Sequence, residues 1–200
     1  MAGFPPEKYY EACITHHLVN EFKERYNKRL YPFSISQIEE SSKGFDFGYV
    51  LSGRSFYIQY KRPFAYVATQ SLYSWQICRN QLSVINSQQH VLRTYYALPA
   101  FVGTGQWFEG LDHTYFVTAS KLAGYLERHR EKTKTSIIHS NLKMLKPWSH
   151  FSSQFVSPPR NAIAQSEQKD ISFEEIIRYT ETLDPETREC TWVYLLEERS

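Results

Sequence analysis

The residues that mark fibrous or low-complexity chains are scarce in this sequence. Its 200 residues include 8 glycines and 9 prolines, too few for a collagen-like repeat or a low-complexity chain. The number and wide spacing of its cysteines fit neither a disulfide framework nor a zinc motif: Cys13, Cys78 and Cys190. We therefore expect a reducing environment and a cytoplasmic protein.

Long apolar runs are also missing. The longest, at about residues 95–102, is far shorter than the roughly 20 residues of a membrane-spanning helix. The first residues contain neither a basic patch nor an apolar run, so we expect no signal peptide and no membrane partner. With 42% hydrophobic and 22% charged residues, the composition is that of a globular domain.

Charge is balanced overall but unevenly distributed. The chain has 23 basic and 21 acidic residues, a net charge of +2. Residues 121–146 contain seven basic and two acidic residues, whereas residues 167–200 contain ten acidic and four basic residues. The basic segment is typical of a surface that faces phosphates, and two ordinary solvated faces are the alternative.

Apolar periodicity predicts a mixed α/β domain with a central sheet. Ile14, Leu18 and Phe22 recur at four-residue steps and predict a helix over residues 7–27. Two alternating segments, 44–51 and 55–61, predict a β-hairpin with Ser52-Gly53-Arg54 as its turn. We expect, in order, a helix at 74–87, strands at 91–98 and 113–118 around a loop at 103–110, a basic helix at 119–132, irregular chain at 147–168, a helix at 173–183 and a strand at 191–196.

Two regions follow from this division. We expect residues 1–150 to form the α/β domain and residues 151–200 to form an acidic extension, a helix and a strand packed on the same domain.

The predicted hairpin brings polar side chains together. If Gly53 and Arg54 form the turn, Asp46 lies opposite Lys61 and Gly48 lies opposite Gln59. Asp46, Gln59 and Lys61 then share one face of the sheet, and Gly48 leaves room for a ligand. A solvated Asp46–Lys61 ion pair is the structural alternative.

A carboxylate also lies on the apolar stripe of the first helix. Glu11 continues the series of Ile14 and Leu18, and an unpaired carboxylate on a buried face is costly. Glu7 lies on the same stripe and is the competing candidate. A favourable interaction of either carboxylate with the helix dipole is the alternative explanation.

These residues resemble a known motif. Glu11 in a first helix, Phe45-Asp46-Phe47 on one strand and Gln59-Tyr60-Lys61 on the next resemble the PD-(D/E)xK nuclease superfamily over about residues 7–102. The superfamily usually has Glu or Asp where this chain has Gln59, although a Glu…Asp…Gln-x-Lys version occurs. The resemblance implies a restriction-endonuclease-like mixed central sheet flanked by helices.

The resemblance also implies a metal centre. Asp46, the side-chain carbonyl of Gln59, the backbone carbonyl of Tyr60, and Glu11 would bind Mg²⁺ or Mn²⁺. Lys61 would orient the attacking water and stabilise developing charge. Because Gln59 replaces a carboxylate, we expect weak Mg²⁺ affinity and better activity with Mn²⁺.

Several side chains are candidates for nucleic-acid contacts. Arg54 and Arg62 flank the motif, and ordinary surface arginines are the alternative. Trp107 could stack on bases, with packing against the core as the alternative. The basic helix would contribute Lys121, Arg128 and Lys132.

We therefore predict a metal-dependent endonuclease that hydrolyses DNA phosphodiester bonds in defence, repair or mobile-element biology, with RNA as the other possible substrate. It would act as a homodimer or as a subunit of a larger complex. The alternative is a catalytically inactive nuclease-fold module that binds nucleic acid or a partner protein. A third hypothesis is an interaction subunit whose acidic tail docks a basic partner.

Overall fold

A computed structural model describes residues 3–34, 44–51, 54–88, 90–129, 134–156 and 192–193. The helices are α1 (Glu7–Tyr26), α3 (Arg79–Ser87), α4 (Ala119–Arg128) and α5 (Ser149–Val156), with 3₁₀ turns η1 (Ala68–Gln70), η2 (Val91–Arg93) and η3 (Thr104–Glu109). The strands are β1 (Tyr31–Ser34), β2 (Phe47–Leu51), β3 (Arg54–Tyr60), β4 (Ala65–Val67), β5 (Leu72–Cys78), β6 (Thr94–Pro99), β7 (Thr114–Thr118), β8 (Thr135–His139), β9 (Lys146–Pro147) and β10 (Trp192–Val193).

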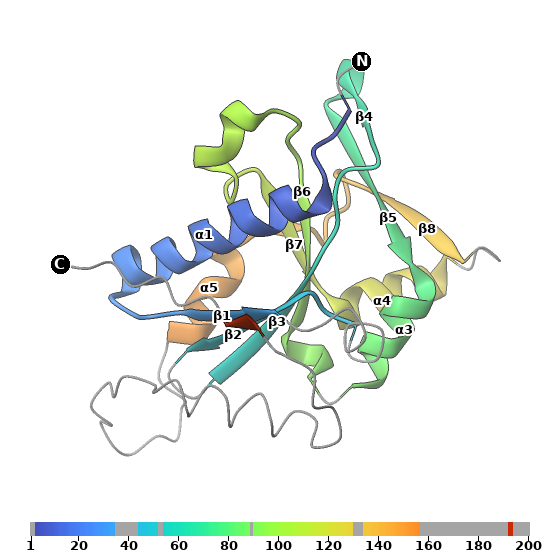
Figure 1. The fold of residues 1–200 in the computed structure, drawn as a ribbon. Helices are drawn as coiled ribbons and strands as arrows, with labels where there is room; N and C mark the ends of the chain where they lie inside the picture. The colour runs from blue at the N-terminus through green and yellow to red at the C-terminus, as the bar shows by residue number, and fades with distance from the viewer. Residues whose placement is uncertain are drawn as a thin grey trace.

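The strands form two sheets. A seven-stranded sheet has the order β10-β1-β2-β3-β6-β7-β9, and a three-stranded sheet has the order β4-β5-β8. In the larger sheet β3 and β6 are parallel, whereas the other neighbouring strands are antiparallel. The expectation of a mixed α/β domain with a mixed central sheet flanked by helices is therefore confirmed (Figure 1).

Each face of the central sheet has its own core. On one face, Ile14 and Phe22 of α1 pack with Ile58 of β3 and Phe151 of α5. On the other face, α3 and α4 pack through Leu82, Ile85, Leu122 and Leu126 against β6 and β7. Successive side chains along a strand point to opposite faces of the sheet, and α1 and α3 accordingly lie on opposite sides of β3.

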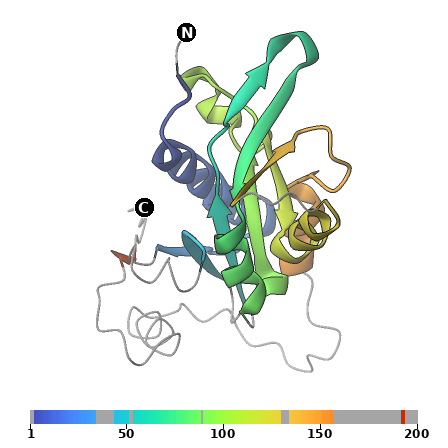
Figure 2. The same cartoon turned by 90° about the vertical axis from the view of Figure 1, so that its right-hand side faces the viewer.

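The smaller sheet begins directly after β3. Its β4–β5 hairpin projects beyond the central sheet, with β8 along its other edge (Figure 2). Phe64, Tyr66 and Val67 on this hairpin are exposed.

The β2–β3 pairing corrects the predicted register. Leu51 pairs with Arg54 and Phe47 with Ile58, so Arg54, which was expected in the turn, belongs to β3. The backbone N–H of Asp46 donates to the carbonyl of Ile58 at 3.1 Å, which continues the ladder and sets Asp46 level with Gln59. The predicted pairing of Asp46 with Lys61 is wrong by two residues, and an even slip leaves every side chain on its predicted face.

Other elements differ more strongly from the expectation. The predicted helix at 74–87 is a strand, β5, followed by the shorter helix α3. Trp75 and Ile77 are buried while Gln76 between them is exposed, which is strand periodicity. Strands β1, β4, β8 and β9 lie outside the predicted strands, and α5 forms where irregular chain is expected.

The acidic extension is described only in part. The predicted helix at 173–183 lies outside the described residues. Within the predicted strand at 191–196, β10 pairs with β1 at the edge of the central sheet. The boundary set at residue 150 falls within α5, and Phe151 of that helix packs in the core beside α1.

Gly48 does not leave space for a ligand, contrary to the expectation. It pairs with Phe33 of β1, and a Cβ at position 48 would overlap the Phe33 ring. The absence of a side chain here therefore makes room for the aromatic ring of Phe33.

Within the described part of the chain, no helix combines the length and apolarity needed to cross a membrane.

We predict that Gly48→Ala lowers the free energy of unfolding by about 1–3 kcal/mol, because the new methyl group displaces Phe33 from its packing. Gly124→Ala in α4 is the matched control. Nothing lies within 4 Å of a Cβ there, so this change raises the free energy of unfolding by up to about 1 kcal/mol. Urea denaturation measures both, and equal effects would contradict the packing described here.

We also predict that buried tyrosine limits stability at alkaline pH. Burial raises the pKa of Tyr95 to about 12, against 10 for an unperturbed tyrosine, and Arg93 opposes part of this shift. The native state therefore keeps the proton while the unfolded chain loses it, so stability falls as the pH rises above about 10. Urea unfolding between pH 8 and about 11.5 should show a shallower decline for Tyr95→Phe than for the wild type. Parallel declines would contradict the assignment.

Candidate metal centre

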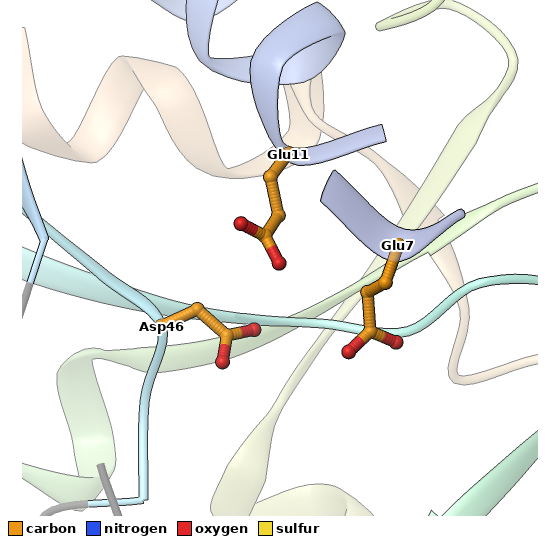
Figure 3. Close-up of side chains that lie close together, drawn as sticks. All are labelled: Glu7, Glu11 and Asp46. Carbon is orange, nitrogen blue, oxygen red and sulfur yellow. The ribbon is translucent and has the colours of Figure 1, made fainter. Parts of the chain in front are cut away.

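Three carboxylates meet where α1 approaches the start of β2. Glu7 and Glu11 lie one helical turn apart on α1, and Asp46 immediately precedes β2. One oxygen atom from each lies within 4.8 Å of the others (Figure 3). Glu11 is 3% exposed and Asp46 is 7% exposed. The burial pattern predicted for Glu11 is thus observed, and Glu7 belongs to the same cluster.

Electrostatics makes this cluster suitable for a cation. Two carboxylate charges 4.8 Å apart repel by about 3–4 kcal/mol at an effective dielectric constant of about 20, and by less for the more exposed Glu7. Because all three donors are carboxylate oxygens, they fit a hard divalent cation such as Mg²⁺ or Mn²⁺. Such an ion would offset the repulsion among all three groups.

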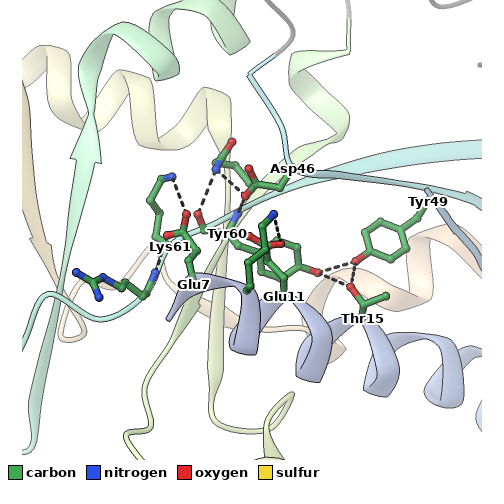
Figure 4. A network of polar contacts seen from close by, with 10 residues as sticks. Glu7, Glu11, Thr15, Asp46, Tyr49, Tyr60 and Lys61 are labelled. Atoms are coloured by element: carbon green, nitrogen blue, oxygen red, sulfur yellow. Dashed lines mark hydrogen bonds and ion pairs between the residues drawn. The ribbon is translucent and has the colours of Figure 1, made fainter. Parts of the chain in front are cut away.

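Asp46 is held by the neighbouring strand. Its Oδ2 atom accepts hydrogen bonds from the backbone N–H of Tyr60 and from Nε2 of Gln59, both at 2.7 Å. Gln59 is fully buried, and its Nε2 also donates to the carbonyl of Tyr60 at 3.2 Å (Figure 4). The structure therefore brings Asp46, Gln59 and Tyr60 together, with the NH₂ group of Gln59 facing Asp46.

Lys61 joins the cluster through Glu7. Its Nζ atom lies 3.8 Å from Oε1 of Glu7, and the backbone N–H of Arg62 donates to Oε2 of the same carboxylate at 3.0 Å. The Lys61 side chain is 14% exposed, so most of it is buried beside Glu7. Lys61 reaches the acidic cluster as predicted, and the ion pair in the structure is with Glu7.

Two further residues contact this cluster. Nζ of Lys8, one residue after Glu7, lies 2.8 Å from Oε2 of Glu11. Gln81 of α3 donates from Nε2 to Oε1 of Gln59 at 2.9 Å. The i,i+3 spacing of Lys8 and Glu11 on the predicted helix is the sequence signal that identifies the first of these contacts. The partner of Gln81 depends on how α3 packs, which the sequence did not indicate.

A triangle of hydroxyl groups underlies the carboxylates. The Tyr49 hydroxyl lies 2.6 Å from that of Tyr60 and 2.7 Å from that of Thr15, and Thr15 and Tyr60 are 3.3 Å apart. Burial raises the pKa of both phenols, and the charge of Glu11 adds to the effect. Both hydroxyls therefore stay protonated and tie α1 to β2 and β3.

The candidate nucleic-acid residues are dispersed. Arg62 is exposed beside Glu7. Trp107 packs against Tyr9 with ring centroids 5.1 Å apart, which matches the core-packing alternative, while its neighbour Phe108 is 84% exposed. Lys121 and Arg128 are exposed on α4, which packs against α3, β6 and β7. Lys132 and the side chain of Arg54 lie outside the described part of the structure.

We predict opposite effects of Gln59→Glu on the metal-free and metal-loaded protein. The change removes a donor from Asp46 and adds a fourth carboxylate, so it lowers the metal-free free energy of unfolding by about 1–3 kcal/mol. Mn²⁺ then binds more tightly and raises Tm by more than in the wild type. Thermal unfolding across a Mn²⁺ titration tests this, with Gln76→Glu on the exposed face of β5 as the control. Identical Mn²⁺ responses for Gln59→Glu and the wild type would contradict the arrangement.

Comparison of the chain with models of known protein families, with curated proteins and with solved structures gives no match. The resemblance to the PD-(D/E)xK superfamily therefore remains an expectation from the motif residues.

Proposed function

We propose that this protein is a metal-dependent endonuclease with a restriction-endonuclease-like fold, which hydrolyses DNA phosphodiester bonds. The observation that carries the proposal is the convergence of Glu7, Glu11 and Asp46 within 4.8 Å, with Nζ of Lys61 at 3.8 Å from Glu7. Carboxylates that hold a cation beside an ammonium group suit phosphodiester hydrolysis, in which negative charge develops on phosphate oxygens.

Each residue has a distinct role in this proposal. Asp46 and Glu11 hold a divalent cation, with Glu7 and the backbone carbonyl of Tyr60 as further oxygen donors. The bound ion would supply Lewis acidity toward the phosphate and lower the pKa of a water molecule. Lys61 donates hydrogen bonds from its ammonium group, which orients the attacking water and stabilises the developing charge.

Charge around the site favours a polyanionic substrate. After Asp46, the next acidic residue along the chain is Glu109, so residues 47–108 contain no carboxylate side chain. This segment forms β2, β3, β4, β5, α3 and β6. None of these elements has a carboxylate side chain that would repel the phosphates of a polynucleotide. Lys61 and Arg62 add positive charge beside the cluster. The carboxylates nearest the proposed scissile phosphate are those that a cation would neutralise.

One observation favours the alternative of a catalytically inactive module that binds nucleic acid. The NH₂ group of Gln59 already satisfies Asp46 and the carbonyl of Tyr60, two of the oxygen donors proposed for the metal. A site satisfied by an internal amide is compatible with a binding protein. Cleavage and retention of DNA separate the two functions.

We predict that the wild type nicks or linearises plasmid DNA in the presence of Mn²⁺, and more slowly with Mg²⁺. Asp46→Ala removes a ligand and Lys61→Ala removes the ammonium group, and each should lower the cleavage rate by roughly a hundredfold or more. Lys121→Ala on α4 is the matched lysine control and should cleave at the wild-type rate.

The outcomes distinguish the candidate functions. Cleavage that depends on Asp46 and Lys61 supports the endonuclease. Salt-sensitive retention of DNA without cleavage supports the inactive module. Absence of both overturns the two nucleic-acid functions and leaves the interaction subunit.

A further inference from the structure

The orientation of the Gln59 amide is determined by its neighbours. One end of the amide faces Asp46 Oδ2 at 2.7 Å and the carbonyl oxygen of Tyr60 at 3.2 Å. Both are acceptors, so this end must be the NH₂ group, which is the only donor in the Gln59 side chain. The oxygen, Oε1, therefore points away from Asp46 and accepts a hydrogen bond from Gln81 at 2.9 Å.

This orientation conflicts with cation binding by Gln59. A cation held by Asp46 and the Tyr60 carbonyl would face an NH₂ group, which has no lone pair to offer. Gln59 becomes a ligand only when its amide turns by half a turn, so that Oε1 and Nε2 exchange places. Because Gln59 is fully buried, an Nε2 left without an acceptor on the other side would carry the full desolvation penalty of an unmade hydrogen bond.

Gln81 is the residue that can accept this reversed amide. Its own side chain carries both a donor and an acceptor, and in the observed state it presents the donor to Gln59. After reversal of Gln59, Gln81 presents its carbonyl oxygen instead. The hydrogen bond is kept, and Asp46 exchanges the NH₂ group for the cation.

The packing of α3 holds Gln81 in place for this contact. Leu82 and Ile85 anchor the helix in the core. Gly44, two residues before Asp46, has φ +80°, and a Cβ there would collide with Ile85 and lie 3.4 Å from the backbone oxygen of Gln81. The chain that leads into Asp46 is thus docked against the same helical turn as Gln81.

We propose that Gln81 is a positioning residue whose amide decides which atom of Gln59 faces Asp46, and that cation binding reverses the two amides together. The inference rests on the proposed metal centre and deepens it. In the absence of metal, the NH₂ group of Gln59 occupies the side of Asp46 that would face the cation. In the presence of metal, Oε1 of Gln59 takes that place and binds the cation. An acidic residue at position 59 has no donor with which to close the site in this way.

A glutamate at position 81 biases the two states in a defined direction. A carboxylate only accepts hydrogen bonds, so Gln81→Glu draws Nε2 of Gln59 toward α3 and turns Oε1 toward Asp46 before any metal is present. In the metal-free site Oε1 then faces the Asp46 carboxylate, and these two acceptors repel each other. A bound cation removes this repulsion. We expect Mn²⁺ to bind about tenfold more tightly, the scale of one hydrogen bond to a charged group.

The experiment measures Mn²⁺ affinity by the electron paramagnetic resonance signal of free Mn²⁺, for the full chain and its variants. Gln76→Glu is the matched control, because it makes the same substitution at an exposed position of β5. A double-mutant cycle adds Gln81→Glu to Gln59→Glu, where no amide remains to be turned. Gln81→Glu should tighten binding in the wild-type background only. Equal tightening in both backgrounds would show a simple charge effect and overturn the inference.

The side-chain NH₂ resonances of Gln59 provide a readout independent of affinity. They are assigned by their loss in Gln59→Glu. Mg²⁺ should shift them in the wild type, and metal-free Gln81→Glu should show them near the Mg²⁺-loaded positions, while Gln76→Glu should not. If the wild type binds Mn²⁺ but Mg²⁺ does not move these resonances, the proposed reversal of the two amides is wrong and the proposed metal centre is unaffected. If the wild type binds no divalent cation, the proposed function fails and the inference fails with it.

Discussion

The arrangement of the site depends on the hydrogen bonds that hold Asp46 against β3. The Tyr60 backbone N–H and the Gln59 amide both donate to one oxygen of this buried carboxylate at 2.7 Å. They fix Asp46 at the end of the β2–β3 ladder, where it faces Glu7 and Glu11 across the gap to α1. Gln59 extends the same contact to α3. Asp46 therefore lies beside the carboxylates of α1 and is linked through Gln59 to α3 on the other face of the central sheet.

Neighbouring donors and cations offset the repulsion among the three carboxylates of this cluster. Buried like charges are tolerated when cations or donors surround them. Glu7 forms an ion pair with Lys61 and accepts a hydrogen bond from the backbone N–H of Arg62. Glu11 forms an ion pair with Lys8, and Asp46 accepts a hydrogen bond from Gln59. Each carboxylate thus has a donor or cation within the protein, while its oxygens lie close enough to those of the other two to share a metal ion. The hydroxyl triangle of Thr15, Tyr49 and Tyr60 stiffens the base of this arrangement.

Local patterns predicted the elements that carry the site, and tertiary packing determined the rest. The spacing of Ile14, Leu18 and Phe22 identified α1, and with it the buried position of Glu11. The hairpin register was wrong by two residues, yet a period of two kept Asp46 and Gln59 on one face. The strand character of residues 72–78 does leave a signal, because the apolar residues Trp75 and Ile77 flank the polar Gln76. The contact of Gln81 with Gln59 and the Phe33 ring over Gly48, in contrast, depend on distant partners. Such partners leave no periodic signal along the chain.

Anomalous diffraction from a crystal grown with Mn²⁺ would show whether the three carboxylates share a cation. We expect one anomalous peak among the oxygens of Glu7, Glu11 and Asp46, with Oε1 of Gln59 turned toward the ion and Nε2 turned toward Gln81. A crystal in which these carboxylates hold no ion, and in which the NH₂ group of Gln59 still contacts Asp46, would contradict it.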